Sequence, residues 1–361
     1  MCYLIKRLGH QEMGSIGEDG RPQRGRYILI SKAPQALGLF PPLSDAIRNH
    51  GVVIPIVPLY NSTPQRIYCN FIYHNDKHVD SNPRGRDEYR IYLNNTLENN
   101  SLLFHEGDIV ILKQDINDLT NPQIDGNGNE DDNDNTLPNI HALFLYHCSD
   151  HESELYQQCS RILDTNPLPR SRGNQAFYQE PLALVEEQIH NLTNTAHGHY
   201  APAVDNTVVN RITNPTTGTD LASLFTSVSF RDFVMTGYNF SCAITHNVIR
   251  YQDIFNLETA HIRARSHGGT YMPNNGIALC RDMHWAFDRG MFTIDDDYHV
   301  RVHPEMQNGY LGQFNNQQIF LPENEFFRPA LENLRYHREH LYGLFIHSAS
   351  LTNAPGYQGN R

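Results

Sequence analysis

The residues best suited to chemistry are two histidines, an asparagine and an aspartate in the last third of the chain. They are His261, Asn275, His284 and Asp288. If the segment around His284 is helical, His284 and Asp288 share one face, because residues four apart on a helix are neighbours. An imidazole and a carboxylate placed in this way can hold one divalent cation and leave coordination positions open for water and phosphate oxygens. The pattern therefore indicates metal-assisted hydrolysis of a phosphate ester.

His261 and Asn275 could have complementary roles in such a site. An imidazole titrates near working pH, so His261 could take a proton from the attacking water. The amide of Asn275 can form hydrogen bonds with backbone groups across a loop and so hold the imidazole facing the metal. Asn274, Asn275 and Gly276 are also a good turn signal, and both interpretations can hold because the loop needs a turn there.

The local sequence predicts the elements that would position these side chains. In chain order we expect a short strand, a turn, a helix and two more strands, over residues 257–262, 266–269, 280–287, 291–294 and 299–302. Gly290 ends the predicted helix. We expect Trp285 and Phe287 to lie in the core, and the acidic residues 295–297 to form a solvated turn.

This segment resembles the HNH endonuclease family, whose ββα-metal fold places a general-base His, a loop Asn and a metal-binding His in this order. The motifs that carry the resemblance are a Cys-x-x-Thr opening, the strand that ends near His261, an Asn-Gly turn, a Leu-Cys pair, the helix with His284 and a closing Phe-Asp-Arg-Gly, at residues 242–245, 257–262, 275–276, 279–280, 284 and 287–290. The resemblance covers roughly residues 226 to 310. It implies that His261 is the general base, Asn275 the positioning residue, His284 a metal ligand and Asp288 a second ligand. The cofactor implied is Mg²⁺ or another divalent cation.

The segment departs from the family pattern at two places. Many family members have Asp, Glu or His immediately before the general base as a further metal ligand, and here that position is Ala260. Glu258 is the nearest replacement, although strand alternation points its side chain to the face opposite His261. Other relatives hold a structural zinc on two Cys-x-x-Cys knuckles, whereas Cys242 and Cys280 each stand without a second cysteine. Two thiols do not complete a tetrahedral site, so we expect no structural zinc and two small buried thiols.

Length and composition indicate an ordinary globular protein with room for two domains. The chain has 361 residues, of which 39% are hydrophobic and 19% charged. No apolar stretch approaches the roughly 18 residues of a membrane span, and the N-terminus lacks a signal peptide's apolar region. The six cysteines are scattered, which indicates reduced thiols. We therefore expect a cytoplasmic protein with no membrane partner.

The net charge of −12 argues against a nucleic-acid ligand, but the charge is unevenly distributed. Five acids fall in one run at 125–135, which we interpret as an exposed disordered loop. From residue 226 onward, 11 arginines face 13 acids. Arginine suits bidentate phosphate contacts, and four arginines cluster around the predicted site, namely Arg263, Arg265, Arg281 and Arg289. The alternative is that they pair with nearby acids.

The N-terminal part has a different pattern, with short runs rich in Val, Ile, Tyr and Phe between turn residues. We expect strands at 27–31, 52–59, 65–73, 88–93, 108–113 and 141–147. A short helix is expected over Ser44–Asn49 and a longer one over Ser149–Leu163, where Ser149 and Glu152 resemble a capping box. This pattern predicts a mostly β, barrel-like first domain over residues 1–165.

This arrangement resembles the B3-like barrel, the DNA-reading domain of some restriction enzymes and plant transcription factors. The resemblance rests on residues 26–31, 40–43, 88–92 and 106–112. It implies that DNA lies across two arms of positive charge, one with Arg21, Arg24, Arg26 and Lys32 and the other with Arg84, Arg86 and Arg90. The alternative is that these side chains belong to ordinary solvated loops.

We expect residues 166–225 to be a linker with an amphipathic helix at Glu180–Leu192, followed by a nuclease domain over 226–350. A C-terminal helix is expected from Leu331 to Leu351. The predicted fold class is therefore α+β, a β-rich domain joined to a ββα-metal domain with flanking helices.

The function predicted is that of a restriction-type DNA endonuclease. An HNH site cuts one strand, so cleavage of double-stranded DNA implies a homodimer. Two alternatives stay open. The first domain could sense a ligand or partner and activate a nonspecific nuclease for defence. With Ala260 in a ligand position, the chain could also be a DNA-binding protein with a degenerate site.

Overall fold

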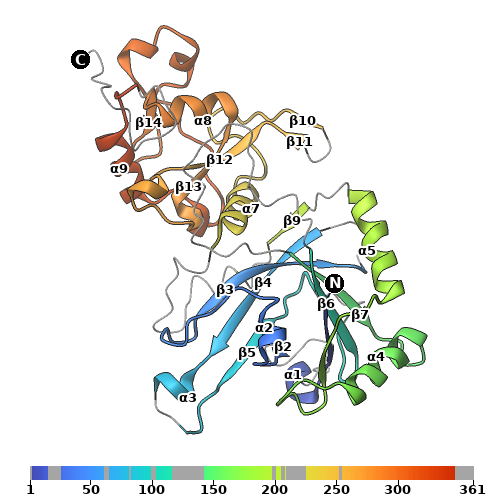
Figure 1. Cartoon of the computed structure of the whole chain (residues 1–361). Coiled ribbons are helices and arrows are strands. Elements are labelled where there is room, and N and C mark those ends of the chain that lie inside the picture. The colour runs from blue at the N-terminus through green and yellow to red at the C-terminus, as the bar shows by residue number, and fades with distance from the viewer. Residues whose placement is uncertain are drawn as a thin grey trace. The chain divides into compact units, whose positions relative to one another are not determined.

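The computed structural model describes residues 2–14, 26–60, 65–80, 83–98, 103–115, 142–196, 201–204, 208, 225–251 and 254–345. These residues form two compact units, the first within residues 1–224 and the second from Phe225 onward. Both units combine strands and helices, so the predicted α+β class is confirmed (Figure 1).

The first unit is built on one curled sheet (Figure 1). Nine described strands pair in the order β2, β5, β4, β3, β7, β6, β1 and β8, with β9 beside β4. The strands are β1 (Tyr3–Arg7), β2 (Tyr27–Ile30), β3 (Gly51–Pro58), β4 (Gln65–His74), β5 (Glu88–Tyr92), β6 (Ile109–Gln114), β7 (Leu143–Cys148), β8 (Gln175–Tyr178) and β9 (Ala201–Ala203). All pairs are antiparallel except β3 with β7 and β4 with β9. The predicted barrel is therefore a half-barrel whose described strands end at β2 and β8.

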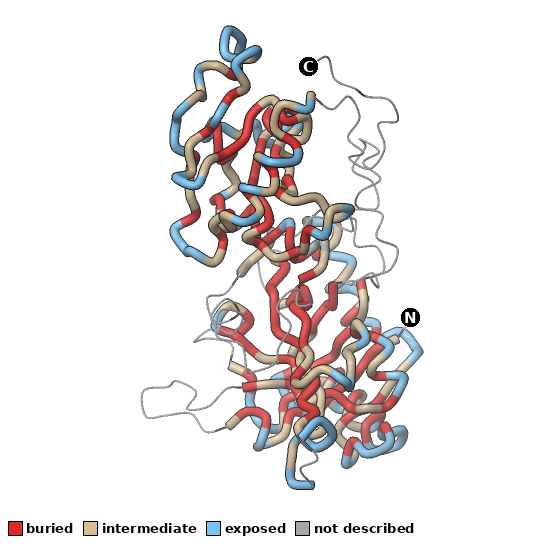
Figure 2. The backbone as a smooth tube through the Cα atoms, turned by 90° about the vertical axis from the view of Figure 1, so that its left-hand side faces the viewer, coloured by how far each residue is buried: buried red, intermediate tan, exposed pale blue. Residues whose placement is uncertain are grey.

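Successive side chains of each strand point to opposite faces of this sheet, and both faces are buried. On β6, Val110 and Leu112 belong to one apolar cluster, whereas Ile109 and Ile111 belong to a second. The second cluster is completed by two helices, α4 (Glu154–Thr165) and α5 (Ala183–Ala196), which cover that face (Figure 1). Burial on both faces makes the central strands the most deeply buried part of the unit (Figure 2).

Three short helices lie in the loops of this unit, and one predicted helix does not form. The helices are α1 (His10–Met13), α2 (Pro34–Leu37) and α3 (Asp76–Val79). The helix predicted over Ser44–Asn49 is absent, and these described residues form bends and a turn. The reason is a competing partner, because the buried Asn75 side chain donates to the carbonyl groups of Asp45 and Ile47, at 2.8 Å each. The side chain thus takes acceptors that a helix would use.

The helix predicted from Ser149 begins later than expected. Ser153 is the N-cap of α4, and its hydroxyl accepts a hydrogen bond from the Tyr156 amide. The Asp150 side chain accepts from the Glu152 amide, which holds the preceding residues in a turn. The predicted capping box at Ser149 and Glu152 is therefore wrong by one turn, although the helix itself is present.

The first unit also extends further along the chain than the predicted domain of residues 1–165. β8 pairs with β1, and β9 pairs with β4. Leu182, just before α5, and Val185, in its first turn, are buried against the sheet. Much of the segment expected to be a linker is thus an integral part of the first unit.

The second unit holds small two-stranded sheets and short helices. Its elements are α7 (Ser227–Gly237), β10 (Arg250–Tyr251), β11 (Ile254–Phe255), β12 (Leu257–His261), η3 (Arg265–His267), η4 (Pro273–Asn275), β13 (Gly276–Cys280), α8 (Arg281–Asp288), β14 (Phe292–Ile294), β15 (Val300–Val302), η5 (Pro304–Met306), η6 (Tyr310–Phe314), η7 (Glu325–Phe327) and α9 (Leu331–His340). β12 and β13 form an antiparallel hairpin, and α8 follows β13 directly. The expected strand and helix are present, and β13 lies between them.

A close approach of α7 fixes the end of this hairpin. Gly276 pairs with His261 across the two strands. A Cβ atom at Gly276 would lie 2.5 Å from a methyl carbon of Val234 and 2.7 Å from the ring of Phe230, so only glycine fits there.

No helix among the described residues is long and apolar enough to cross a membrane.

Candidate active site

His261 ends β12 and lies against aromatic side chains. Its ring stacks on Phe230 of α7, with centroids 4.3 Å apart, and Tyr271 approaches at 5.6 Å. The Nε2 atom is shielded from solvent and has no hydrogen-bond partner among the described residues. Burial, followed by the positive charges of Arg265 and His284, lowers the pKa of His261 to about 3. The ring therefore stays neutral and able to accept a proton, although a low pKa weakens it as a base.

Asn275 holds the loop that follows His261. It is 1% exposed, and its Oδ1 atom accepts from the Arg263 amide at 3.0 Å. Its Nδ2 atom donates to the carbonyl groups of Arg263 and Thr270, at 3.0 and 2.9 Å. The two bonds with Arg263 join the ends of the loop between β12 and β13, and the third ties its middle to the same amide. The amide thus has the backbone contacts that the sequence predicted for a positioning residue.

His284 lies between two carboxylates. Its Nδ1 atom is 2.8 Å from Oε2 of Glu258, and its Nε2 atom is 3.3 Å from Oδ2 of Asp288, one turn further along α8. Oε1 of Glu258 pairs with Nε of Arg281 at 3.1 Å. Hydrogen bonding to His284 is the main cause of the low pKa of Glu258. The charge of His284 also lowers the pKa of His261, so the two imidazoles influence each other electrostatically.

The His284 and Asp288 pair suits a divalent cation. An imidazole nitrogen and a carboxylate oxygen are common donors for such ions, and two adjacent ligands at ~2.1 Å from an octahedral ion lie about 3 Å apart. The observed separation of 3.3 Å fits that spacing. Within the part of the chain that the structure describes, no three His, Cys, Asp or Glu side chains converge on a ready-made metal site. The protein thus presents two candidate ligands.

Glu258, the nearest replacement for the ligand absent at Ala260, contacts His284. Alternation along β12 places its side chain on the same face as Ala260, the position of the absent ligand, and opposite His261. A side chain on this strand that faces away from His261 can therefore still contact α8. The sequence signal for this is that Glu258 stands two residues before Ala260, because residues two apart on a strand point to the same face.

The arginines near the site are held mainly by neutral groups. Arg263 donates to the carbonyl of His267 at 2.6 Å and lies over the ring of Tyr336. Arg289 donates to the carbonyl of Trp285 at 3.2 Å and lies over that indole. Arg265 contacts the Gly269 carbonyl and the Tyr271 ring, whereas Arg281 pairs with Glu258. Trp285 is 52% exposed, so the expectation that it lies in the core is wrong, while Phe287 is buried as predicted.

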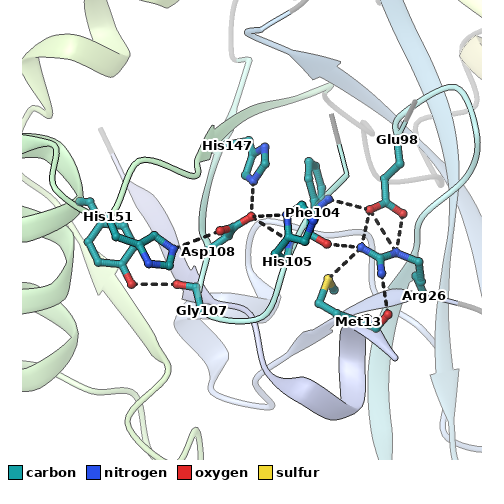
Figure 3. Close-up of polar contacts among 10 residues, drawn as sticks. Met13, Arg26, Glu98, Phe104, His105, Gly107, Asp108, His147 and His151 are labelled. Atoms are coloured by element: carbon teal, nitrogen blue, oxygen red, sulfur yellow. Dashed lines mark hydrogen bonds and ion pairs between the residues drawn. The ribbon is translucent and has the colours of Figure 1, made fainter. Parts of the chain in front are cut away.

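Four of the basic residues predicted to bind DNA in the first unit have acidic partners. Arg26 is 4% exposed and forms a buried ion pair with Glu98, and it also donates to backbone carbonyls of Met13 and Phe104 (Figure 3). Burial in this network removes Arg26 as a DNA contact. The other ion pairs join Lys32 to Asp87, Arg86 to Asp76 and Arg90 to Glu88. Arg84 is exposed, and Arg21 and Arg24 lie outside the described residues.

Two further clusters contain titratable side chains. Beside the Arg26 network, Asp108 is buried and within 2.8 Å of Nε2 of His147 and 3.1 Å of Nε2 of His151 (Figure 3). In the second unit, Cys242 and Cys280 share a hydrogen bond that lowers the pKa of Cys242 and raises that of Cys280. The Thr245 amide donates to the Cys242 sulfur at 3.5 Å. Both clusters consist of groups that satisfy one another.

Comparison with known proteins agrees with the geometry of the second unit. Residues 242–295 match the model of the HNH endonuclease family, and this range contains all four candidate site residues. Among solved structures, a modification-dependent TagI restriction endonuclease is 26% identical, with a TM-score of 0.25, over 34% of this chain and 40% of that chain. No curated protein matches the sequence. The second unit thus carries an HNH endonuclease segment, and the chain matches less than half of the length of that solved structure.

Proposed function

We propose that this protein is a metal-dependent DNA endonuclease whose C-terminal unit hydrolyses phosphodiester bonds. One observation carries the proposal. The segment that matches the HNH endonuclease family carries His261, Asn275, His284 and Asp288 on β12, α8 and the loop between β12 and β13; the charge of His284 acts on His261, and His284 lies 3.3 Å from Asp288. Such a combination of spacing and contact is far more specific than any one histidine.

The chemistry follows from the contacts of each side chain. His284 and Asp288 would hold a divalent cation, which would supply Lewis-acid stabilisation of charge at the scissile phosphate. His261 takes the proton of the attacking water through its imidazole. The negative charge of a bound phosphate raises the pKa of His261 and so strengthens it as a base. Asn275 fixes the loop, and Arg263 and Arg289 stabilise charge on the phosphate.

For the first unit, we propose that its role is to choose where the nuclease acts. A sequence or modified-base reader makes the whole chain a restriction-type enzyme. It cuts both strands as a homodimer, because one site cuts one strand. The ion pairs of Lys32, Arg86 and Arg90 favour a second candidate, in which this unit senses a small ligand or a partner and licenses a nonspecific nuclease.

Plasmid cleavage tests these proposals. Purified protein is incubated with methylated and with unmodified plasmid, with Mg²⁺ or with a chelator. We expect Mg²⁺-dependent cleavage that falls about 10²–10⁴-fold in His261→Ala, the usual contribution of a general base. His190→Ala is the matched control, because His190 is exposed on α5 of the first unit and contacts Asn194. Discrete fragments support a reader, and a smear that needs an added ligand supports the sensor. If wild type and His261→Ala both leave both plasmids intact, the proposed endonuclease activity on these substrates is refuted.

A further inference from the structure

Glu258 contacts the proposed metal-binding histidine from the side opposite its partner ligand. Its Oε2 atom lies 2.8 Å from Nδ1 of His284, whereas Oδ2 of Asp288 lies 3.3 Å from Nε2 of the same ring. Ring nitrogens Nδ1 and Nε2 point in different directions, so the two carboxylates contact different edges of the imidazole. Only Asp288 lies where it could share a cation with Nε2.

This contact determines which nitrogen can bind a metal. A carboxylate accepts hydrogen bonds and cannot donate them when ionised, so Glu258 requires a hydrogen on Nδ1. In a neutral ring, Nε2 then keeps its lone pair and directs it toward Asp288. Metal-binding histidines are commonly oriented by a carboxylate on the other ring nitrogen, which fixes the tautomer and increases the basicity of the ligand.

The second oxygen of Glu258 is also engaged. Oε1 pairs with Nε of Arg281 at 3.1 Å, and this pair keeps the carboxylate ionised and in place. The Glu258 side chain is 21% exposed and that of His284 is 15% exposed, so neither group is freely mobile in solvent. With one oxygen on Nδ1 and the other on Arg281, the geometry is that of an orienting group and not of a direct ligand.

We propose that Glu258 is the positioning residue of His284, and that it compensates for the missing ligand at Ala260 by making the remaining histidine a better one. The inference rests on the proposed metal pair of His284 and Asp288. It assigns to this chain a Glu, His and Asp arrangement in which only the last two bind the ion. Glu258 acts through the imidazole.

Binding of Mn²⁺ to the full-length protein without DNA tests the inference, with free Mn²⁺ measured by electron paramagnetic resonance. We expect Glu258→Ala to weaken Mn²⁺ binding roughly 10–100-fold, the usual cost of losing an orienting group. Glu258→Gln should stay within a few-fold of wild type, because its amide oxygen still accepts from Nδ1. Glu305→Ala is the matched control, since it removes the same charge from an exposed position of the same unit.

The two Glu258 variants separate an orienting role from the other possibilities. If Glu258→Gln binds Mn²⁺ as weakly as Glu258→Ala, the carboxylate is a direct ligand or a simple charge, and the inference is wrong. Unchanged affinity in Glu258→Ala also overturns it. Thermal melting identifies a variant that has merely lost its fold, in which case Glu258→Gln decides. Wild type that binds no Mn²⁺ removes both the metal pair and the inference, whereas the expected binding pattern without DNA cleavage defeats only the proposed function.

Discussion

The basic side chains at the candidate site and those predicted to bind DNA in the first unit are held in different ways. At the site, Arg263 and Arg289 are held by carbonyl groups and aromatic rings, whereas Arg281 pairs with Glu258. In the first unit, Arg26 and Lys32 are bound to carboxylates, as are Arg86 and Arg90. Neutral partners leave positive charge available to a phosphate, and carboxylates cancel it.

This contrast shows which kind of sequence signal carries information about function. Counting positive residues in a stretch of sequence takes no account of the acids that the fold brings to them. Glu98, for example, lies 72 residues from Arg26. Fixed spacing within one short hairpin and helix is different, because local geometry alone brings its members together. The contrast can be tested by four substitutions.

Replacing Arg26 should give the largest effect. Arg26→Leu leaves Glu98 as a buried charge without its partner, which typically costs about 3–5 kcal/mol. We expect the first unit to lose that much stability in denaturant unfolding followed by circular dichroism. Fluorescence of Trp285, the one tryptophan in the sequence, reports the second unit separately and should be unchanged.

Two further variants check that the loss comes from the buried pair. Arg161→Leu removes an exposed arginine of the same unit and should change stability little. Replacing both Arg26 and Glu98 by leucine should recover part of the loss, because no lone charge stays buried. If Arg26→Leu instead keeps full stability and weakens DNA binding, Arg26 is a DNA contact and the contrast between the units fails.

Much of the fold could be predicted from sequence because its strands follow local rules. Six predicted strands, from 27–31 to 141–147, correspond to β2 through β7. β1 went unpredicted, since it contains Lys6, which is fully buried in an ion pair with Glu12. A buried lysine can be anticipated only when its partner is known. The helix predicted over Ser44–Asn49 failed for a similar reason, because Asn75, distant in sequence, takes its carbonyl groups.

In the candidate site too, some contacts could be predicted from the sequence and others could not. The contacts of Asn275 and the pairing of His284 with Asp288 follow from a turn and a single helix, so spacing was enough to predict them. The role of Glu258 depends on how α8 packs on β12, and sequence spacing does not reveal packing. The exposure of Trp285 depends on packing too, since an aromatic residue beside buried positions is expected to be buried itself.

Replacing Asn275 should have the next largest effect. Asn275→Ala removes three hydrogen bonds and leaves backbone groups of Arg263 and Thr270 without their partner. At about 1–3 kcal/mol for buried unsatisfied groups, we expect a loss of about 3 kcal/mol in the second unit, measured by Trp285 fluorescence during unfolding. Asn274→Ala is the matched control at the neighbouring position. Full stability with lost cleavage would make Asn275 a reacting group and not a positioning residue.

Replacing Asp87 should have a smaller effect on stability, and this effect should depend on pH. Burial raises the pKa of Asp87, but hydrogen bonds from Lys32, Tyr73 and His78 outweigh burial and lower the pKa to about 2. A pKa below that of the unfolded chain means that ionised Asp87 stabilises the fold above about pH 4, and that this contribution disappears as pH falls toward 2. The shift corresponds to about 2 kcal/mol at pH 7.

Asp87→Asn measures that contribution directly. We expect the variant to be less stable than wild type by about 2 kcal/mol at pH 7, and the difference to shrink steadily below pH 4. Asp164→Asn, an exposed aspartate on α4, should show no such trend. A difference that stays constant with pH would mean that Asp87 does not neutralise Lys32 in solution, and Lys32 would return to the set of candidate DNA contacts.

The smallest effect should come from Arg281, which lies at the site yet has an acidic partner. Its side chain is 68% exposed, and an exposed pair with Glu258 contributes roughly 0–1 kcal/mol, so Arg281→Gln should leave stability unchanged.

DNA binding is measured by fluorescence anisotropy at several salt concentrations, in a His261→Ala background that prevents cleavage. Each lost phosphate contact lowers the slope of log K against log salt by about one unit. Because Glu258 cancels much of its charge, Arg281→Gln should change the slope by less than Arg289→Gln, whose partner is a neutral indole. Equal slopes for the two variants would show that a carboxylate partner does not prevent a phosphate contact, and the paired cations of the first unit would then be DNA contacts on the same grounds.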